Sequence, residues 1–306
     1  MATLAPSDLA EEHMPVRRSA FRHPVVRRIN HWTNVVAVAF MIMTGLTIFN
    51  AHPALYVGQY GSEYDKPALA ISGANGHGWV EIAGHKYGTT GVLGWSDGQQ
   101  RAFPNWAKFP SEQDLATGRN WHLFFAWVLV LNGIVYWLSS LAHRHIQRDL
   151  LPTAGEIAPR NLLHDIKSHA TLNFPTGVDS NHYHVLQKLA YLSAVALFIP
   201  GMIVTGLAMS PGADSVAPWI VDLLGGRQTA RLLHFACMWA LIGFIVVHVA
   251  AVLLAGVGNQ LRSMITGRWA YDDDGRGPSG PPAPTTLAAD IQVASIQVAP
   301  LQVAAR

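Results

Sequence analysis

Four long apolar stretches constrain the fold of this 306-residue chain more than any other feature. They lie at roughly 29–50, 121–142, 186–209 and 231–256, and each is close to the ~20 residues that a helix needs to cross a bilayer. Only 13% of the residues are charged, against ~25% in a typical soluble domain. We therefore predict an all-α integral membrane protein, a four-transmembrane-helix bundle that contacts membrane lipid and no nucleic acid.

The segments around these stretches divide the chain into three parts. Residues 1–28 form an N-terminal segment, residues 29–270 the four-helix domain, and residues 271–306 a tail rich in Gly, Pro and Ala that we expect to be disordered. The loop at 51–120 is far longer than a hairpin link, and long loops are often functional. We expect it to form a small ordered cap with short strands, and we expect an amphipathic helix around 157–170.

Basic residues predict the orientation. The segments on the side of the two termini hold fourteen Lys and Arg residues, and the two connections on the opposite side hold seven. The positive-inside rule then places both termini in the cytoplasm of a bacterial inner membrane, with the chain crossing several times. The first twenty residues have no apolar core of a signal peptide, so we predict no cleaved leader.

Two histidines in the fourth stretch indicate the chemistry. His234 and His248 are fourteen residues apart. At ~100° per residue, a helix brings the second side chain to within ~40° of the first and ~21 Å further along the axis. Imidazole is a common axial ligand of haem iron, and a histidine inside a membrane is by default a functional candidate. We therefore predict two metal centres at two depths in the membrane.

Two further histidines fall at matching depths. His31 opens the first stretch on the predicted cytoplasmic side, and His122 opens the second stretch on the outer side. Because the fourth helix runs from outside to inside, depth pairs His122 with His234 at an outer site. The same reasoning pairs His31 with His248 at an inner site.

Other residues near these sites leave alternatives open. His143 or His145, at the cytoplasmic end of the second stretch, could replace His31. Arg119 and Arg231 flank the outer pair and would suit the propionates of a haem, although arginines are also ordinary at a membrane interface. Cys237 is the only cysteine, which excludes a four-thiolate cluster and haem attachment through Cys-x-x-Cys-His. Any haem would be a non-covalent haem b.

Two other kinds of protein compete with an electron carrier. A histidine-lined transporter would be expected to carry acidic residues or broken helices inside the membrane, and the four stretches contain no Asp or Glu. A haem-free membrane anchor for a periplasmic enzyme would leave His234 and His248 unexplained. The chain shows no nucleophile, paired carboxylates or phosphate loop, so we expect an electron-transfer subunit without substrate chemistry of its own.

The motifs together resemble a known family. The sequence Arg-x-x-His-Trp ends at Trp32, Trp-His ends at His122, and His-x(13)-His ends at His248. This pattern, over about 21–270, is similar to the prokaryotic di-haem membrane cytochromes b of Ni-Fe hydrogenases, formate dehydrogenases and thiosulfate reductases.

The resemblance implies the cofactors and the partner. It implies two haem b groups, the inner one on His31 and His248 and the outer one on His122 and His234. It also implies electron transfer between the quinone pool and a periplasmic redox subunit. The enlarged first loop is more similar to the thiosulfate-reductase type, which favours a molybdopterin oxidoreductase as the partner.

Overall fold

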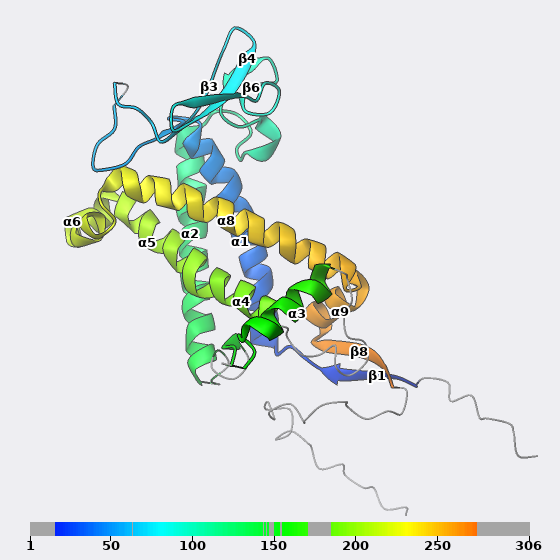
Figure 1. Cartoon of the computed structure of the whole chain (residues 1–306). Coiled ribbons are helices and arrows are strands. Elements are labelled where there is room, and N and C mark those ends of the chain that lie inside the picture. The colour runs from blue at the N-terminus through cyan, green and yellow to red at the C-terminus, as the bar shows by residue number, and fades with distance from the viewer. Residues whose placement is uncertain are drawn as a thin grey trace, which may run out of the picture.

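The computed structural model describes residues 16–273, apart from 63, 143, 145, 147–149, 154 and 171–184. Four helices are long and apolar enough to cross a membrane. A small sheet lies at one end of these helices and a two-stranded ribbon at the other (Figure 1); we call these the cap end and the ribbon end. The predicted fold class, mainly helical with four candidate spans and a structured first loop, is confirmed.

The four spans begin and end close to the predicted stretches. Three are single helices, and the third span joins α4 to α5 through the π-helical turn η4. Their bounds are α1 Val25–Phe49, α2 Leu115–Ala142, α4 Val185–Ser193, η4 Ala194–Phe198, α5 Ile199–Met209 and α8 Arg227–Leu254. Pro200 lies just after the π turn. Because proline has no N–H and its ring clashes with the preceding turn, a wide turn at this point accommodates it.

Helix α2 begins before its apolar stretch because Asp114 caps it. The backbone N–H of Thr117 donates to the Asp114 carboxylate at 3.0 Å, and that of Gly118 donates to the Asp114 carbonyl at 3.0 Å. Hydrogen bonds from Thr117 also hold the pKa of the Asp114 carboxyl below its usual value. An aspartate that satisfies the free N–H groups of the first turn is a strong N-cap, so the helix starts at Leu115.

The spans pack as two pairs, α1 with α2 and α5 with α8. Asn30 and Asn132 form a reciprocal clamp between α1 and α2, in which each side-chain amide donates to the other residue's carbonyl, at 2.9 and 3.0 Å. The Asn132 amide also donates to Asn34 Oδ1 at 2.7 Å. Since lipid offers no hydrogen-bond partners, such amides stabilise helix pairs in membranes.

The cap-end contacts within the two pairs differ in character. The rings of Phe40 and Phe125 stack at 4.5 Å between α1 and α2. Between α5 and α8, a Cβ added to Gly201 would lie 3.3 Å from Cys237 Sγ, so the absence of a side chain lets these two helices approach closely.

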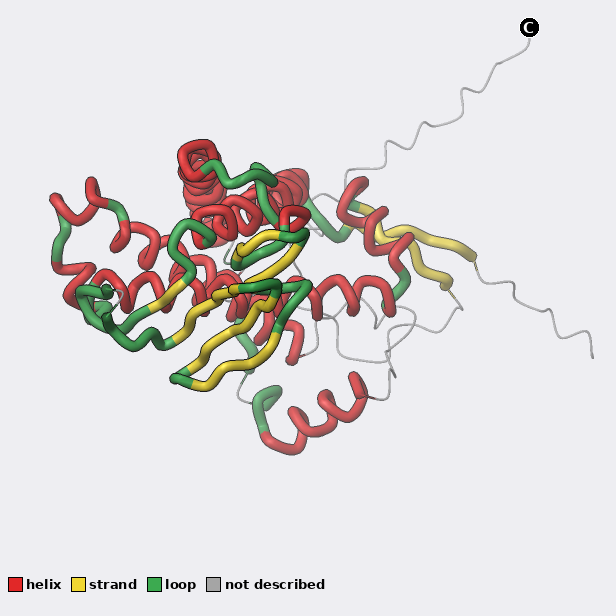
Figure 2. The backbone as a smooth tube through the Cα atoms, turned by 90° about the horizontal axis from the view of Figure 1, so that it is seen from above, coloured by secondary structure: helices red, strands yellow, loops and turns green. Residues whose placement is uncertain are grey.

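The cap is a small antiparallel structure inserted between α1 and α2. Its main sheet has the order β2-β3-β4-β5, and a separate hairpin pairs β6 with β7 before the short 3-10 helix η1. The bounds are β2 Ala54–Leu55, β3 Leu69–Ala74, β4 His77–Ile82, β5 His85–Gly88, β6 Gly94–Ser96, β7 Gln99–Arg101 and η1 Asn105–Ala107. Seen from above, these strands lie over the helix ends (Figure 2). The predicted ordered cap with short strands is present.

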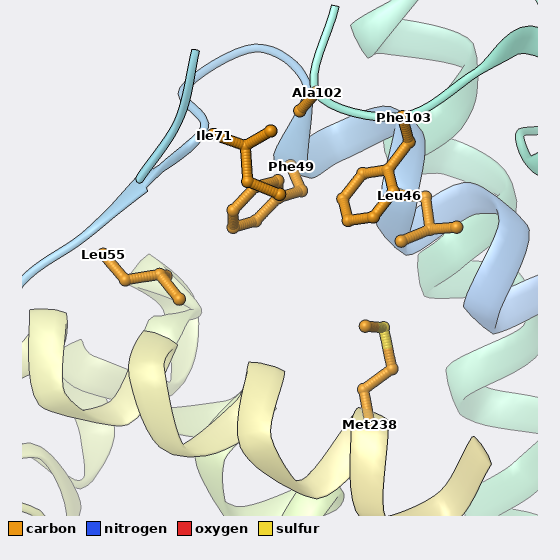
Figure 3. Close-up of a cluster of buried hydrophobic side chains, with 7 residues drawn as sticks. All are labelled: Leu46, Phe49, Leu55, Ile71, Ala102, Phe103 and Met238. Carbon is orange, nitrogen blue, oxygen red and sulfur yellow. The ribbon is translucent and has the colours of Figure 1, made fainter. Parts of the chain in front are cut away.

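A buried apolar cluster joins the cap to both helix pairs. It contains Leu46, Phe49, Leu55, Ile71, Ala102, Phe103 and Met238, from α1, the cap and α8 (Figure 3). The ring of Phe49 also stacks on that of Phe235 from α8 at 4.7 Å. The cluster therefore fixes α1 and α8 relative to each other at the cap end.

The first turn of α8 is hydrogen-bonded to the cap. The carbonyl of Gly58 accepts the backbone N–H groups of Gln228 at 3.0 Å and Thr229 at 3.2 Å, and the Gly58 N–H donates to Thr229 Oγ1 at 2.8 Å. N–H groups in the first turn of a helix have no partner within the helix. Here the cap supplies that partner.

The ribbon end joins the two ends of the folded chain. Strand β1 (Val16–Phe21) pairs antiparallel with β8 (Arg268–Asp273), which follows α9 (Val257–Thr266). The Trp32 indole N–H of α1 donates to the Met264 carbonyl of α9 at 3.2 Å, and the Arg28 guanidinium donates to the Ile265 carbonyl. Helix α1 is therefore attached to the segment that follows α8.

His23 lies in this junction, between β1 and α1. It is 7% exposed, and its backbone N–H donates to the Gly267 carbonyl at 3.3 Å. Burial, with the nearby charges of Arg22 and Arg27 as further causes, lowers the pKa of His23 to about 3.

The remaining elements connect the spans. Helix α3 (Pro159–Ala170) occupies the position of the predicted amphipathic helix, and α6 (Pro211–Val216) and α7 (Trp219–Leu223) link α5 to α8. Strand β8 continues to Asp273, so the boundary expected at 271 falls inside a strand, because these residues pair with β1. Residues 274–306 of the expected tail lie outside the described residues.

Candidate functional site

One helix supplies a histidine to each of two sites. Helix α8 carries His234 toward the cap end and His248 toward the ribbon end, and both side chains are half-buried. Each of the two rings faces a histidine from the α1–α2 pair. The site is therefore built across the two helix pairs, with α8 on one side at both levels.

At the cap-end level, His122 of α2 faces His234 of α8. Their ring centroids are 6.3 Å apart with an interplanar angle of 62°. We call these residues the cap-end pair. The sequence placed these two residues at one depth, and the structure brings their rings together.

At the ribbon-end level, His31 of α1 faces His248 of α8. Their ring centroids are also 6.3 Å apart, with an interplanar angle of 63°. We call these residues the ribbon-end pair. Phe244 stacks on His248 at 5.8 Å and 13°, and Tyr191 of α4 meets the same ring edge to face at 6.0 Å. These aromatic rings limit how far the imidazole of His248 can turn.

The spacing of both pairs suits two imidazoles that bind one metal ion from opposite sides. A metal–imidazole bond of about 2.0 Å on each side, plus roughly 1.1 Å from each nitrogen to its ring centre, gives about 6.2 Å between ring centres. The separation is 6.3 Å in each pair. Within the described residues no group of three or more His, Cys, Asp or Glu could hold a metal ion. Two imidazoles on an axis, with the other ligands supplied by a macrocycle, is the arrangement of a bis-histidine haem.

A threonine and a glycine stand beside each histidine of the cap-end pair. Thr44 Oγ1 lies 3.0 Å from His122 Nδ1, and Thr205 Oγ1 lies 2.9 Å from His234 Nδ1. A Cβ added to the next residue, Gly45 or Gly206, would lie 3.5 or 3.6 Å from Cε1 of the same ring. Each glycine therefore lies directly beside the edge of an imidazole, at a distance where a methyl group would be in ordinary contact with the ring. The Thr-Gly pairs that occur in both helices of the sequence thus serve the same level of the site.

The two arginines expected at the cofactor have different surroundings. The Arg231 guanidinium donates to the Ala54 carbonyl at 2.8 Å and to the His52 carbonyl, so it joins α8 to the cap. Arg119 is exposed near the start of α2. A role for either residue at a propionate stays a prediction.

The other histidines named from the sequence do not enter these two levels in the described part of the chain. His52, His77 and His85 are exposed in the cap. His143 and His145, the alternatives to His31, lie outside the described residues, as do His182, His184 and the side chains of His164 and His169.

The sequence reasoning missed the hydroxyl partners of the cap-end pair. Thr44 and His122 are 78 residues apart in sequence, and Thr205 and His234 are 29 apart. The signal in the sequence is a short repeat, Thr-Gly-Leu, which occurs at 44–46 in the first span and again at 205–207 in the third. It acquires meaning only once each Thr-Gly is placed against a histidine of the neighbouring helix.

Four membrane helices with two facing histidine pairs define a class, the membrane cytochromes that bind haem and carry electrons. Comparison with known families is more specific. Residues 22–267 match the family described as prokaryotic cytochrome b561, and the chain belongs to that family.

Relatives of this chain are named as subunits of different enzymes. The chain is 29% identical, over 80% of its length and 96% of the relative, to an Azospira oryzae protein named as a protein-methionine-sulfoxide reductase subunit, YedZ1. It is 22% identical, over 87% of its length and 92% of the relative, to a Bradyrhizobium diazoefficiens protein named as a Ni/Fe-hydrogenase B-type cytochrome subunit. A Rhodobacter capsulatus protein of that second name is 20% identical over 84% of each chain. No solved structure matches the chain.

These relatives correct one expectation. The general family resemblance is confirmed, whereas the closer likeness to thiosulfate-reductase cytochromes is not supported, because the relatives are named as a sulfoxide-reductase subunit and as hydrogenase cytochromes. The enlarged loop that suggested the thiosulfate-reductase type is the cap, and a loop of this size does not identify the partner enzyme.

Proposed function

We propose that this protein is the di-haem electron conduit of a membrane oxidoreductase complex. In this proposal His122 and His234 hold one haem b and His31 and His248 hold another. The observation that carries the proposal is that both pairs have ring centres 6.3 Å apart, at two levels along α8. Fourteen residues between His234 and His248 correspond to ~21 Å along a helix.

The residues of the chain contribute position and surroundings to this function. A bound haem supplies a centre that takes up and releases one electron. The helices would hold the imidazoles that bind each centre, and the Phe244 ring, which stacks on His248, would help to exclude water from the ribbon-end centre. Ligand identity, hydrogen bonds to the ligands and burial are the means by which a protein adjusts the potential of such a centre.

The proposal includes an orientation and two exchange partners. With both termini in the cytoplasm, the cap would face the periplasm and would dock a redox subunit near the cap-end pair. Quinone would exchange electrons near the ribbon-end pair. The basic residues on the side of the termini support this orientation, fourteen against seven.

We propose a molybdopterin-type reductase as the periplasmic partner, in preference to a hydrogenase. The support is the relative with the higher identity, whose name is that of a protein-methionine-sulfoxide reductase subunit. The two partner classes make opposite predictions in native membranes. Adding a methionine-sulfoxide protein should reoxidise the dithionite-reduced cytochrome after excess reductant is removed, and H₂ should not reduce the oxidised form. Reduction by H₂ without reoxidation by the sulfoxide would identify a hydrogenase partner instead.

A haem count tests the conduit itself. The purified full-length protein should contain two haem b per chain in a pyridine haemochrome assay, with two steps in a redox titration. His122→Ala and His248→Ala should each lose one haem, and they should remove different titration steps. His85→Ala, which alters an exposed histidine of β5, is the matched control and should retain both haems. A wild type that folds with haem supplied and yet binds none would refute the proposal.

A further inference from the structure

The hydroxyls of Thr44 and Thr205 have one proton each, and the structure shows where it goes. Thr44 Oγ1 lies 2.6 Å from the Phe40 carbonyl, one helical turn earlier, and Thr205 Oγ1 lies 2.6 Å from the Gly201 carbonyl. Two oxygens this close must share a proton, because otherwise their lone pairs would repel each other. Each hydroxyl therefore donates to its own helix.

The direction of the threonine–histidine hydrogen bonds follows. A hydroxyl has one donor and two acceptor lone pairs, so a threonine that has given its proton to a carbonyl can only accept from a second partner. The Nδ1 atoms of His122 and His234, at 3.0 and 2.9 Å, must then be the donors. Both rings are consequently protonated at Nδ1, which leaves the lone pair of a neutral imidazole on Nε2.

We infer that Thr44 and Thr205 are positioning residues for one haem, the one held by the cap-end pair, and that they fix both rings as the tautomer that binds iron through Nε2. This inference rests on the proposed function. A ring nitrogen that donates to an acceptor fixes the orientation of a metal-binding histidine and raises the basicity of the ligand. The chain provides this twice at one level, from two different helices.

The burial of the hydroxyls supports the inference. Thr44 is 0% exposed and Thr205 is 3% exposed, although both lie in helices whose surroundings are mostly apolar. A buried hydroxyl has a cost unless it is hydrogen-bonded, and a threonine bonded only to its own helix gains little over valine. The contact with an imidazole of the neighbouring helix gives each hydroxyl a role that valine could not fill.

The experiment replaces each hydroxyl with a methyl group of similar shape. Thr44→Val and Thr205→Val remove the hydroxyl acceptor and leave the nearby backbone carbonyls of Met41 and Met202 in place, and Thr44→Ser retains the hydroxyl. Thr47→Val is the matched control, because Thr47 is 0% exposed on the same helix and donates to the Phe109 carbonyl at 3.0 Å, not to a histidine. All variants are made in the full-length chain and are examined by redox titration and haem content.

The expected result is specific to one titration step. Thr44→Val and Thr205→Val should both raise the potential of the same step, because a less basic ligand stabilises ferric iron less. They should also weaken retention of that haem by roughly 10- to 100-fold. The other step should not move, Thr47→Val should change neither step, and Thr44→Ser should restore the wild-type values. The inference is overturned if the two valine variants move different steps, or if neither variant moves any.

A second measurement keeps this inference separate from the proposed function. The ¹⁵N spectrum of protein labelled at histidine, in the reduced state, reports which ring nitrogen carries the proton, whether or not haem is bound. His122 and His234 should show a protonated Nδ1 in the wild type, assigned by loss of their signals in His→Ala variants. Protonation at Nε2 would overturn the inference. A wild type without haem but with Nδ1 protonated would overturn the proposed function and leave the tautomer assignment standing.

Discussion

Substituting Gly226, the residue before α8, should detach the cap from that helix. Gly226 has φ +110° and ψ 164°, a conformation that is essentially restricted to glycine. A Cβ at this position would lie 2.4 Å from the carbonyl carbon and 2.5 Å from the carbonyl oxygen of Gly58. Both are backbone atoms, so no side-chain rotation can relieve the clash.

The size of the effect can be worked out from these contacts. Forcing alanine into this backbone conformation costs about 1–3 kcal/mol. Moving the Gly58 carbonyl away removes the two hydrogen bonds that it accepts from the backbone N–H groups of Gln228 and Thr229, at about 1 kcal/mol each. We therefore expect Gly226→Ala to destabilise the attachment by about 3–5 kcal/mol.

Gly225→Ala is the matched control. Gly225 also has a positive φ, +76°, but an added Cβ would come no closer than 3.9 Å to the Thr229 side chain. The left-handed conformation alone should cost about 1–2 kcal/mol. Hydrogen exchange of the Gln228 and Thr229 amides, measured by mass spectrometry on the detergent-solubilised protein, should be faster in Gly226→Ala than in Gly225→Ala by roughly 30- to 100-fold. Equal exchange in the two variants would refute the assignment of the close contact between Gly226 and Gly58.

Three further predictions concern other contacts. Asn132→Leu removes two hydrogen bonds, to Asn30 and Asn34, so it should weaken the packing of α1 on α2 by about 1 kcal/mol. Haem occupancy of the ribbon-end pair should fall first, and an equal loss at both levels would contradict this prediction. Arg231→Gln should raise protease sensitivity of the cap while haem content stays near two per chain, whereas loss of one haem would favour a propionate role. The pKa of His23 is lowered from 6.5 to about 3, so the unfolded state binds more protons in that window. Stability should therefore fall as pH decreases from about 6.5 toward 3, and His23→Gln should flatten the dependence in a pH series of thermal melts.

The helices and the two levels of the site were predictable from the sequence because they depend on local properties. A run of apolar residues indicates a span whatever its neighbours are, and the fourteen-residue interval puts His234 and His248 on one helix face. The pairing of His31 with His248 needed only the order of the helices. The structure brings these rings together, and their role as ligands stays a prediction.

The features that the sequence did not reveal depend on contacts between distant segments. Strand β1 pairs with β8 from the opposite end of the domain, and neither strand has a partner nearby in sequence. Arg231 lies next to the cap-end pair in sequence, but its guanidinium reaches the carbonyls of His52 and Ala54. A long side chain near a site can turn toward any of several neighbours, and only the fold decides which.

Helix α8 is held by hydrogen bonds near both of its ends. Its first turn is hydrogen-bonded to Gly58 of the cap. The helix that follows it, α9, is hydrogen-bonded to Trp32 of α1. Between these contacts α8 also packs on α5 and, through Phe235 and Met238, on the buried cluster below the cap. Because His234 and His248 lie on one helix, a rigid-body displacement of α8 would move both imidazole rings together. The separation of the two rings in each pair therefore depends on contacts at both ends of α8 as well as on the packing of the helices against each other.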